Sequence, residues 1–163
     1  AYQALLSGAA GQVFGNNPVW HFHGSGVEAA ALTWRQALDS SGAHGMTHLR
    51  SLFDRLPWWR LQPDRKGALV IRGAGVGQDR VAAALSPDGA LAVLYVPMQR
   101  PVTLDLSQLA GPRVMSTWFD PSGGRFAPVA GAPYRTERPM RFQPSGSTSD
   151  GHGDWVLVLV SQP

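Results

Sequence analysis

The stretch Arg55-Leu56-Pro57-Trp58-Trp59-Arg60-Leu61-Gln62-Pro63-Asp64 divides the chain into two parts of different character. Before it, alanines and leucines recur at helical spacing; after it, short β-rich runs alternate with Gly, Pro and Asp turns. Pro57 breaks a helix and drives Leu56 toward an extended conformation, so a helix is expected to end here. Adjacent tryptophans are seldom left bare in soluble chains. The sequence therefore predicts that Trp58 and Trp59 pack between two layers or domains.

The composition is that of a globular protein. The 163 residues give room for one domain or two small ones, and we expect two, at residues 1–64 and 65–163. Hydrophobic residues make up 44% of the chain, but no apolar run is long enough for a membrane span. The net charge of +3 comes from scattered arginines, which argues against nucleic acid as a partner. Without cysteine there is neither a disulfide framework nor a thiolate site.

The first sixty residues predict helices and one brief strand. Residues 1–10 indicate a short helix that stops at Gly8, and the lack of a cap or signal peptide before it predicts that the chain begins inside a domain. The next elements expected are a strand at Gly11–Gly15, a segment of helical composition at Glu28–Leu38, and an amphipathic helix at Ala43–Leu56 capped by Ser41.

The remaining hundred residues predict strands only. Two of the connections, Pro87-Asp88-Gly89 and Asp120-Pro-Ser-Gly-Gly124, are typical of tight hairpins. Many short strands with no helix between them favour a β-sandwich or a small barrel. The strand candidates are Ala68–Arg72, Val81–Leu85, Leu91–Val96, Val102–Leu106, Val114–Phe119, Arg125–Val129, Met140–Phe142 and Trp155–Val160.

A glycine-rich segment imitates a dinucleotide-binding fingerprint but departs from it in detail. In Gly73-Ala-Gly75-Val-Gly77 the third glycine of the G-x-G-x-x-G pattern falls on Gln78, and Pro87 leaves too little room for a crossover helix. A glycine-rich β-hairpin is the favoured interpretation, and no cofactor is expected.

Metal and catalytic sites are not favoured either. His21 and His23 would share one face of a strand, and His44 and His48 lie one helical turn apart, but a zinc site needs three or four ligands. The two glutamates of the chain, Glu28 and Glu137, fall in different halves, so no pair of carboxylates is expected to flank a glycosidic bond.

The residues Asn16, Asn17, Trp20 and His21 form the candidate binding site. A strand followed by a polar and aromatic loop is how a (β/α) barrel presents ligand-contacting residues, and an indole ring can stack on the apolar face of a sugar. The alternative is that Trp20 packs under the loop while the asparagines form a turn. On spacing alone that alternative is favoured.

Several stretches together resemble known families. The N-terminal ones resemble the end of the catalytic barrel of apiosidase-like glycoside hydrolases, and the later ones resemble the all-β family called "putative collagen-binding domain of a collagenase". Taken together, the two resemblances cover nearly the whole chain. They are Ala1–Trp20, Met46–Phe53 and Pro57–Asp64 for the barrel, and Trp118–Pro121 and Asp154–Leu159 for the all-β domain.

The resemblance implies an α+β fragment, the last strand and helices of a (β/α)8 barrel followed by an antiparallel β-sandwich. Gln12–Phe14 would be the eighth barrel strand, although the family commonly has His-Thr-Tyr there, and Ala43–Leu56 the last barrel helix. The loop Asn16–His21 would border the substrate cleft. Apolar surface should be exposed on the N-terminal part, where the missing strands would pack.

The function implied is that of a bacterial glycoside hydrolase, secreted or periplasmic, that acts on plant-type glycosides. The family's catalytic carboxylates would precede Ala1, so this chain alone is expected to be inactive and to need the missing N-terminal barrel as its partner, with carbohydrate as the substrate. A different class of function stays open, in which the sandwich is a non-catalytic module that binds collagen or polysaccharide.

Overall fold

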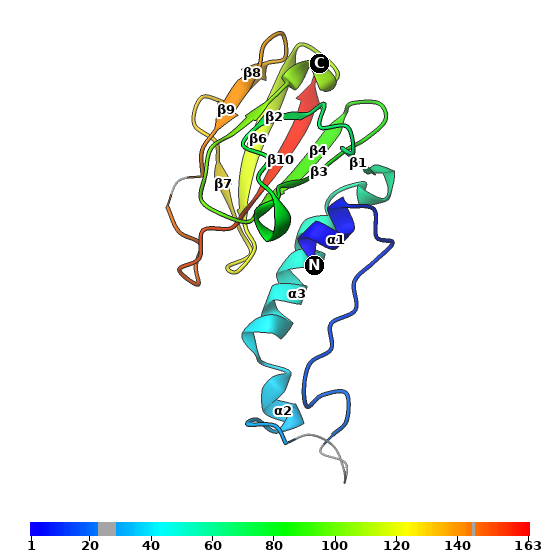
Figure 1. Ribbon diagram of the computed structural model, residues 1–163, viewed down its shortest axis with the longest axis vertical. Helices are drawn as coiled ribbons and strands as arrows, with labels where there is room; N and C mark the ends of the chain where they lie inside the picture. Colours follow the sequence, from blue (N-terminus) through cyan, green and yellow to red (C-terminus); the bar gives the residue numbers. More distant parts are fainter. Residues whose placement is uncertain (23–28, 145) are drawn as a thin grey trace.

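The computed structural model describes residues 1–22, 29–144 and 146–163. The strands form the upper body, and helices α2 and α3 extend from it (Figure 1). The helical elements are α1 (Tyr2–Leu6), α2 (Trp34–Ala37), α3 (Ser41–Phe53) and the 3-10 turns η1 (Trp58–Arg60), η2 (Gly77–Asp79) and η3 (Leu106–Gln108). The strands are β1 (Gln62–Pro63), β2 (Val70–Arg72), β3 (Ala82–Leu85), β4 (Leu91–Val96), β5 (Val102–Leu104), β6 (Arg113–Asp120), β7 (Arg125–Pro128), β8 (Tyr134–Arg135), β9 (Met140–Phe142) and β10 (Trp155–Gln162).

The strands form two antiparallel sheets. The larger sheet has the order β1-β3-β4-β10-β6-β7, with β8 also paired to β6, and the smaller has the order β2-β5-β9. A hydrophobic cluster lies between them, with Val102, Leu104 and Phe142 from the small sheet and Leu94, Leu157 and their neighbours from the large one. The predicted β-sandwich is confirmed. Both predicted hairpins are also present, joining β3 to β4 and β6 to β7.

Part of the other face of the large sheet is buried as well. A second hydrophobic cluster joins α1 and α3 to this face. Tyr2 and Leu6 of α1, and Leu49, Leu52 and Phe53 of α3, pack there against strands β3, β4, β6 and β10. Trp58 packs against this cluster, with its ring edge-on to Phe53 at a centroid distance of 6.3 Å.

Trp59 does not pack between layers, which corrects the expectation for the second tryptophan. Its side chain is 72% exposed. Both tryptophans lie in the 3-10 turn η1, where successive side chains point about 120° apart because the turn has about three residues per repeat. With Trp58 directed at the second cluster, Trp59 must point elsewhere.

The N-terminal part differs from the expectation in three places. Gln12–Phe14 is not a strand, since none of the residues that the structure describes pairs with it, and Val13 is 90% exposed. The barrel fragment is therefore not confirmed. Helix α3 is capped by Ser40, not Ser41, because the Ser40 hydroxyl accepts from the Ala43 amide.

The segment of helical composition at Glu28–Leu38 forms a shorter helix than expected. Residues 23–28, which include His23 and Glu28, lie outside the described residues. In the rest of the segment, Thr33 and Gln36 form a capping box, so the helix begins only at Trp34. Among the described helices none is long and apolar enough to cross a membrane.

Two stacked tyrosines at the junction of α1 and the sheet differ in how their hydroxyls are satisfied. The rings of Tyr2 and Tyr95 stack at 5.3 Å. The Tyr95 hydroxyl donates to Asp154 Oδ2 at 3.0 Å, and burial of Asp154 raises its carboxyl pKa despite this bond. The buried Tyr2 hydroxyl has no hydrogen-bond partner among the described residues.

Replacing each tyrosine by phenylalanine should therefore have opposite effects. Tyr2→Phe removes an unsatisfied buried group and should raise the free energy of unfolding by about 1 kcal/mol, whereas Tyr95→Phe should lower it by about 1–2 kcal/mol. Urea denaturation of both variants measures this difference. Equal destabilisation by the two changes would show that the Tyr2 hydroxyl is bonded in solution.

Asp120 holds together the β6–β7 turn and the loop before β10. Its carboxylate accepts from the amide and hydroxyl of Ser122, from the Gly123 amide, and from the amide and hydroxyl of Ser149. Burial alone would raise the pKa of Asp120, but the hydrogen bonds from Ser149, Ser122 and Gly123 outweigh it and lower the pKa to about 2.

This lowered pKa predicts a pH-dependent contribution to stability. Because the folded-state pKa lies below the usual value of about 3.9, the contribution is complete above about pH 4 and is lost as the pH falls through about 2. Asp120→Asn should lower the free energy of unfolding by about 1–3 kcal/mol at pH 7, and the difference from the parent chain should shrink toward pH 2. Denaturant titrations at several pH values test this, with the exposed Asp54→Asn as control. A difference that stays constant with pH would contradict it.

Candidate functional site

The loop that carries Asn16, Asn17, Trp20 and His21 is fastened to the connection between α2 and α3. Asn16 Nδ2 donates to the Ala37 carbonyl at 2.6 Å and to Ser40 Oγ at 3.3 Å. Ser40 is also the N-cap of α3, so one residue serves both the helix and the loop. Asn16 thus has a positioning role.

The other three candidate residues lie together on the loop. His21 Nε2 and Asn17 Oδ1 are 2.6 Å apart, so the imidazole donates to the amide oxygen when Nε2 carries the hydrogen. The Trp20 ring is edge-on to His21 at 4.5 Å and is 62% exposed. Trp20 therefore does not pack under the loop, and the alternative interpretation of this tryptophan is wrong.

Three residues that the sequence analysis did not assign to the site extend this aromatic surface. Phe22, at 63% exposed and with a φ of 53°, places its ring edge-on to Trp34 at 5.4 Å. The Arg35 guanidinium lies over the Trp34 ring at 4.2 Å. The sequence gives one signal for Trp34 and Arg35, the Thr33 capping box that begins α2. The spacing of apolar residues along the chain does not show that α2 approaches the loop.

The loop offers an indole and an amide that suit sugar binding, and among its described residues the His21 imidazole is the group that could also exchange a proton. Among the described residues, Asp39 is an acidic residue next to Ser40, the anchor of the loop, and it pairs with His44 Nε2 at 2.8 Å. Glu137 lies in the other part of the chain, 4.0 Å from Arg135. An exposed indole beside amide and imidazole groups can stack on a sugar ring and bond to its hydroxyls, and it cannot by itself protonate a leaving group.

The described histidines lie apart from one another. His44 faces Asp39, while His48 packs against the β6–β7 turn, where a Cβ added at Gly124 would lie 2.7 Å from His48 Cδ2. Within the part of the chain that the structure describes, no three His, Asp or Glu side chains are grouped so that they could hold a metal ion.

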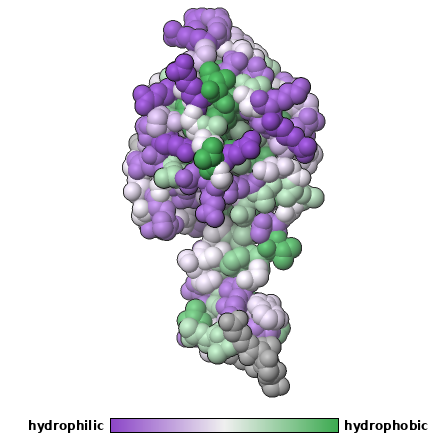
Figure 2. Space-filling view, in the orientation of Figure 1, coloured by the Kyte–Doolittle hydropathy of each residue, from purple (hydrophilic) through white to green (hydrophobic). Residues whose placement is uncertain are grey.

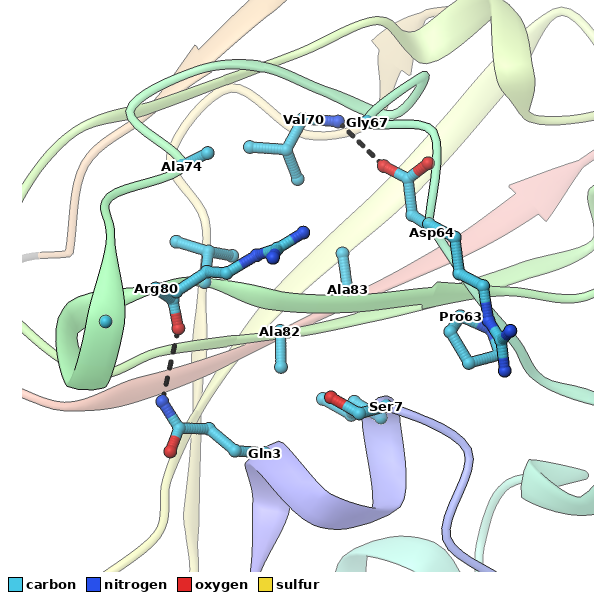
Figure 3. A pocket seen from close by; sticks show the side chains of 14 residues that line it. Gln3, Ser7, Pro63, Asp64, Gly67, Val70, Ala74, Arg80, Ala82 and Ala83 are labelled. Atoms are coloured by element: carbon cyan, nitrogen blue, oxygen red, sulfur yellow. Dashed lines mark hydrogen bonds between the residues drawn. The ribbon is translucent and has the colours of Figure 1, made fainter.

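A cavity of about 360 Å³ lies where α1 meets the edge of the large sheet (Figure 3). Two of its polar side chains are used by the fold: Gln3 Nε2 donates to the carbonyls of Gln78 and Arg80, and the Asp64 carboxylate accepts from the amides of residues 68–70. The cavity is therefore a structural junction, and Asp64 serves the turn that leads into β2.

The glycine-rich segment that imitated a dinucleotide site connects the two sheets. The Arg100 guanidinium fills the loop, donating to the Ala74 carbonyl at 3.2 Å and to the Asp79 carbonyl. Gly75 has a φ of 68°, and a Cβ there would lie 2.5 Å from the backbone carbonyl oxygen of Asp79, which explains the glycine. The loop is thus filled by a side chain of the protein.

These observations define a two-layer antiparallel β-sandwich with helices packed on its larger sheet. Residues 63–160 match the family model described as "Putative collagen-binding domain of a collagenase", and residues 1–60 match the one described as "Apiosidase-like, catalytic domain". The first match spans more than half of the sequence, so the chain belongs to that collagen-binding-domain family, with an apiosidase-like segment before it.

Two solved structures are similar to the chain. One, described as "Glycoside hydrolase", has a TM-score of 0.84 and 24% identity over 99% of this chain and 35% of its own. The other, a glycoside hydrolase family 5 protein from Bacteroides vulgatus ATCC 8482, has a TM-score of 0.68 and 23% identity over 79% of this chain and 26% of its own. The likeness is one of fold, and the chain spans only about a third or less of these proteins. No curated protein matches the chain by sequence.

The role of Asn16 can be separated from that of Asn17. Asn16→Ala removes two hydrogen bonds between the loop and the α2–α3 connection, so it should lower the free energy of unfolding by about 1 kcal/mol and expose residues 16–22 to protease. Asn17→Ala, the matched control, removes only an exposed contact and should change neither quantity much. Denaturation and limited proteolysis measure both, and equal behaviour of the two variants would refute the positioning role.

Proposed function

We propose that this chain is the C-terminal portion of a glycoside hydrolase that acts on plant-type glycosides, with the loop Asn16–His21 bordering its substrate cleft. The catalytic carboxylates would belong to barrel strands outside these 163 residues. The observation that carries the proposal is the exposed Trp20 ring beside the Asn17–His21 pair. The apiosidase-like match over residues 1–60 supports it.

Exposed apolar side chains on the N-terminal part support a missing barrel partner. Figure 2 shows hydrophilic side chains covering much of the upper body, while hydrophobic and neutral ones are more frequent along the helical extension. A barrel whose strands and helices packed here would cover such groups. The large exposed ones in this part are Val13, Phe14, Trp20, Phe22, Leu32, Leu38 and Trp59.

In this proposal the sandwich supports the barrel. The second hydrophobic cluster fixes α1 and α3 on the large sheet. The N-cap residue of α3, Ser40, is in turn hydrogen-bonded to Asn16 of the loop. An enzyme for plant polysaccharides would meet its substrate outside the cytoplasm, so we place the parent protein in a secreted or periplasmic location. The family description keeps collagen as an alternative ligand of the sandwich.

The test uses the whole protein in which these residues occur. Trp20→Ala should lower kcat/KM on plant oligosaccharides by about tenfold, since one lost stacking contact is worth roughly 1–1.5 kcal/mol. The 163-residue chain alone should show no hydrolysis. Release of reducing sugar measures both.

Trp59→Ala is the matched control. Trp59 is also exposed, but it follows the opposite end of α3, which at 13 residues is about 20 Å long. Trp59 contacts no substrate in this proposal, so even where the missing barrel covers it, its replacement should leave kcat/KM within about twofold. Unchanged catalysis in Trp20→Ala would remove the loop from the cleft, and turnover by the isolated chain would show that its own residues supply the catalytic groups.

A further inference from the structure

The outer face of the small sheet carries a row of side chains whose direction follows from the strand register. Thr103 of β5 lies opposite Arg72 of β2 on one side and Arg141 of β9 on the other. Its neighbours Val102 and Leu104 are fully buried, so Thr103 points outward. Directly opposed residues share one face of a sheet, so both arginines also point outward.

The pairing of β2 with β5 is irregular at this point. The register shifts between Val70 and Arg72, which places Ile71 and Arg72 together opposite Thr103. Ile71 is 44% exposed and adds an apolar group beside the first guanidinium. The face therefore combines two cations, a hydroxyl and an apolar side chain.

Neither arginine is neutralised by a carboxylate of the described residues. No ion pair among the described residues involves Arg72 or Arg141. Asp105, which follows β5, is turned to its own loop, where it accepts from the amide and hydroxyl of Ser107. Two exposed guanidiniums thus share one face without a carboxylate partner.

We propose that this face binds an acidic polysaccharide, with one carboxylate on Arg72 and another on Arg141. Neighbouring strands lie about 4.8 Å apart, so the two arginine backbones are about 10 Å apart across β5. This is about the length of two pyranose rings, so carboxylates on every second sugar match the two guanidiniums, each of which can hold a carboxylate with two parallel hydrogen bonds. Thr103 and Ile71 then face the intervening sugar.

The same face is a poor match for nucleic acid. Proteins that bind single strands stack the bases on aromatic side chains, and the outward residues of this row include none. A sparsely charged sugar chain fits both the spacing and the composition of the row.

The experiment measures binding of the 163-residue chain to hyaluronan, which carries one carboxylate per disaccharide, and to alginate, which carries one per sugar. Dextran is the neutral control, and single-stranded DNA the polyanion that is not a sugar. Both acidic polysaccharides should bind at low salt, and Arg72→Gln and Arg141→Gln should each weaken binding by about tenfold, or about 1.4 kcal/mol.

Arg113→Gln is the matched control, because Arg113 is an exposed arginine on β6 of the other sheet and has no ion pair among the described residues. It should bind within about twofold of the parent chain. Circular dichroism would confirm that each variant is folded. No binding to either acidic polysaccharide, tighter binding to DNA, or unchanged binding by the Arg72→Gln, Arg141→Gln double variant would each overturn the proposal. The outcome is independent of the loop Asn16–His21, so it does not depend on the glycosidase assignment.

Discussion

Burial of strand β10 on both faces is the constraint on which the rest of the structure depends. Residues 155–159 are all buried, with Leu157 and Leu159 in the cluster between the two sheets and Val156 and Val158 in the cluster under the helices. Apolar side chains project from both faces of such a strand. Each face must therefore be covered by another layer of the protein, so that these side chains are removed from water. The small sheet provides one cover, and α1 with α3 provides the other. The helices are therefore part of the sandwich's core and not an appendage to it.

The strands were predictable where local chemistry and packing agree. Leu91–Val96 and Met140–Phe142 form with the predicted bounds, and the hairpins follow their turn residues. The strand expected to reach Leu106 ends at Leu104, because the Asp105 side chain accepts from the Ser107 amide and starts a 3-10 turn. The sequence analysis missed the two-residue strands β1 and β8, because two residues are too few to show a period. These strands form only because β3 and β6, distant in the sequence, offer backbone groups with which they pair.

The candidate site was predictable in its residue types but not in its geometry. The sequence identifies Trp20 as a possible platform, yet its exposure depends on where the rest of the loop is held. That is decided by Asn16, whose partners Ala37 and Ser40 lie 21 and 24 residues away in the sequence. The failed strand at Gln12–Phe14 has the same origin, because a strand is stabilised by its neighbours and its own composition shows only that it could pair. The exposure of Trp20 and the absence of a strand at Gln12–Phe14 are both decided by contacts between distant segments, which the periodicity of the sequence does not show.

Helix α3 connects the large sheet of the sandwich to the loop to which we assign substrate binding. Its C-terminal half is fixed by Leu49, Leu52 and Phe53 in the second cluster, and its N-cap Ser40 receives Asn16 from the loop. Because a helix is rigid, packing of the C-terminal half of α3 on the sheet also fixes the position of its N-terminus. The loop that is bonded to this N-terminus is thereby held in place. The sandwich thus affects the position of the loop through α3. A cavity created in the second cluster would shift Trp20 while leaving the arginine row intact, since the small sheet is held by the other cluster.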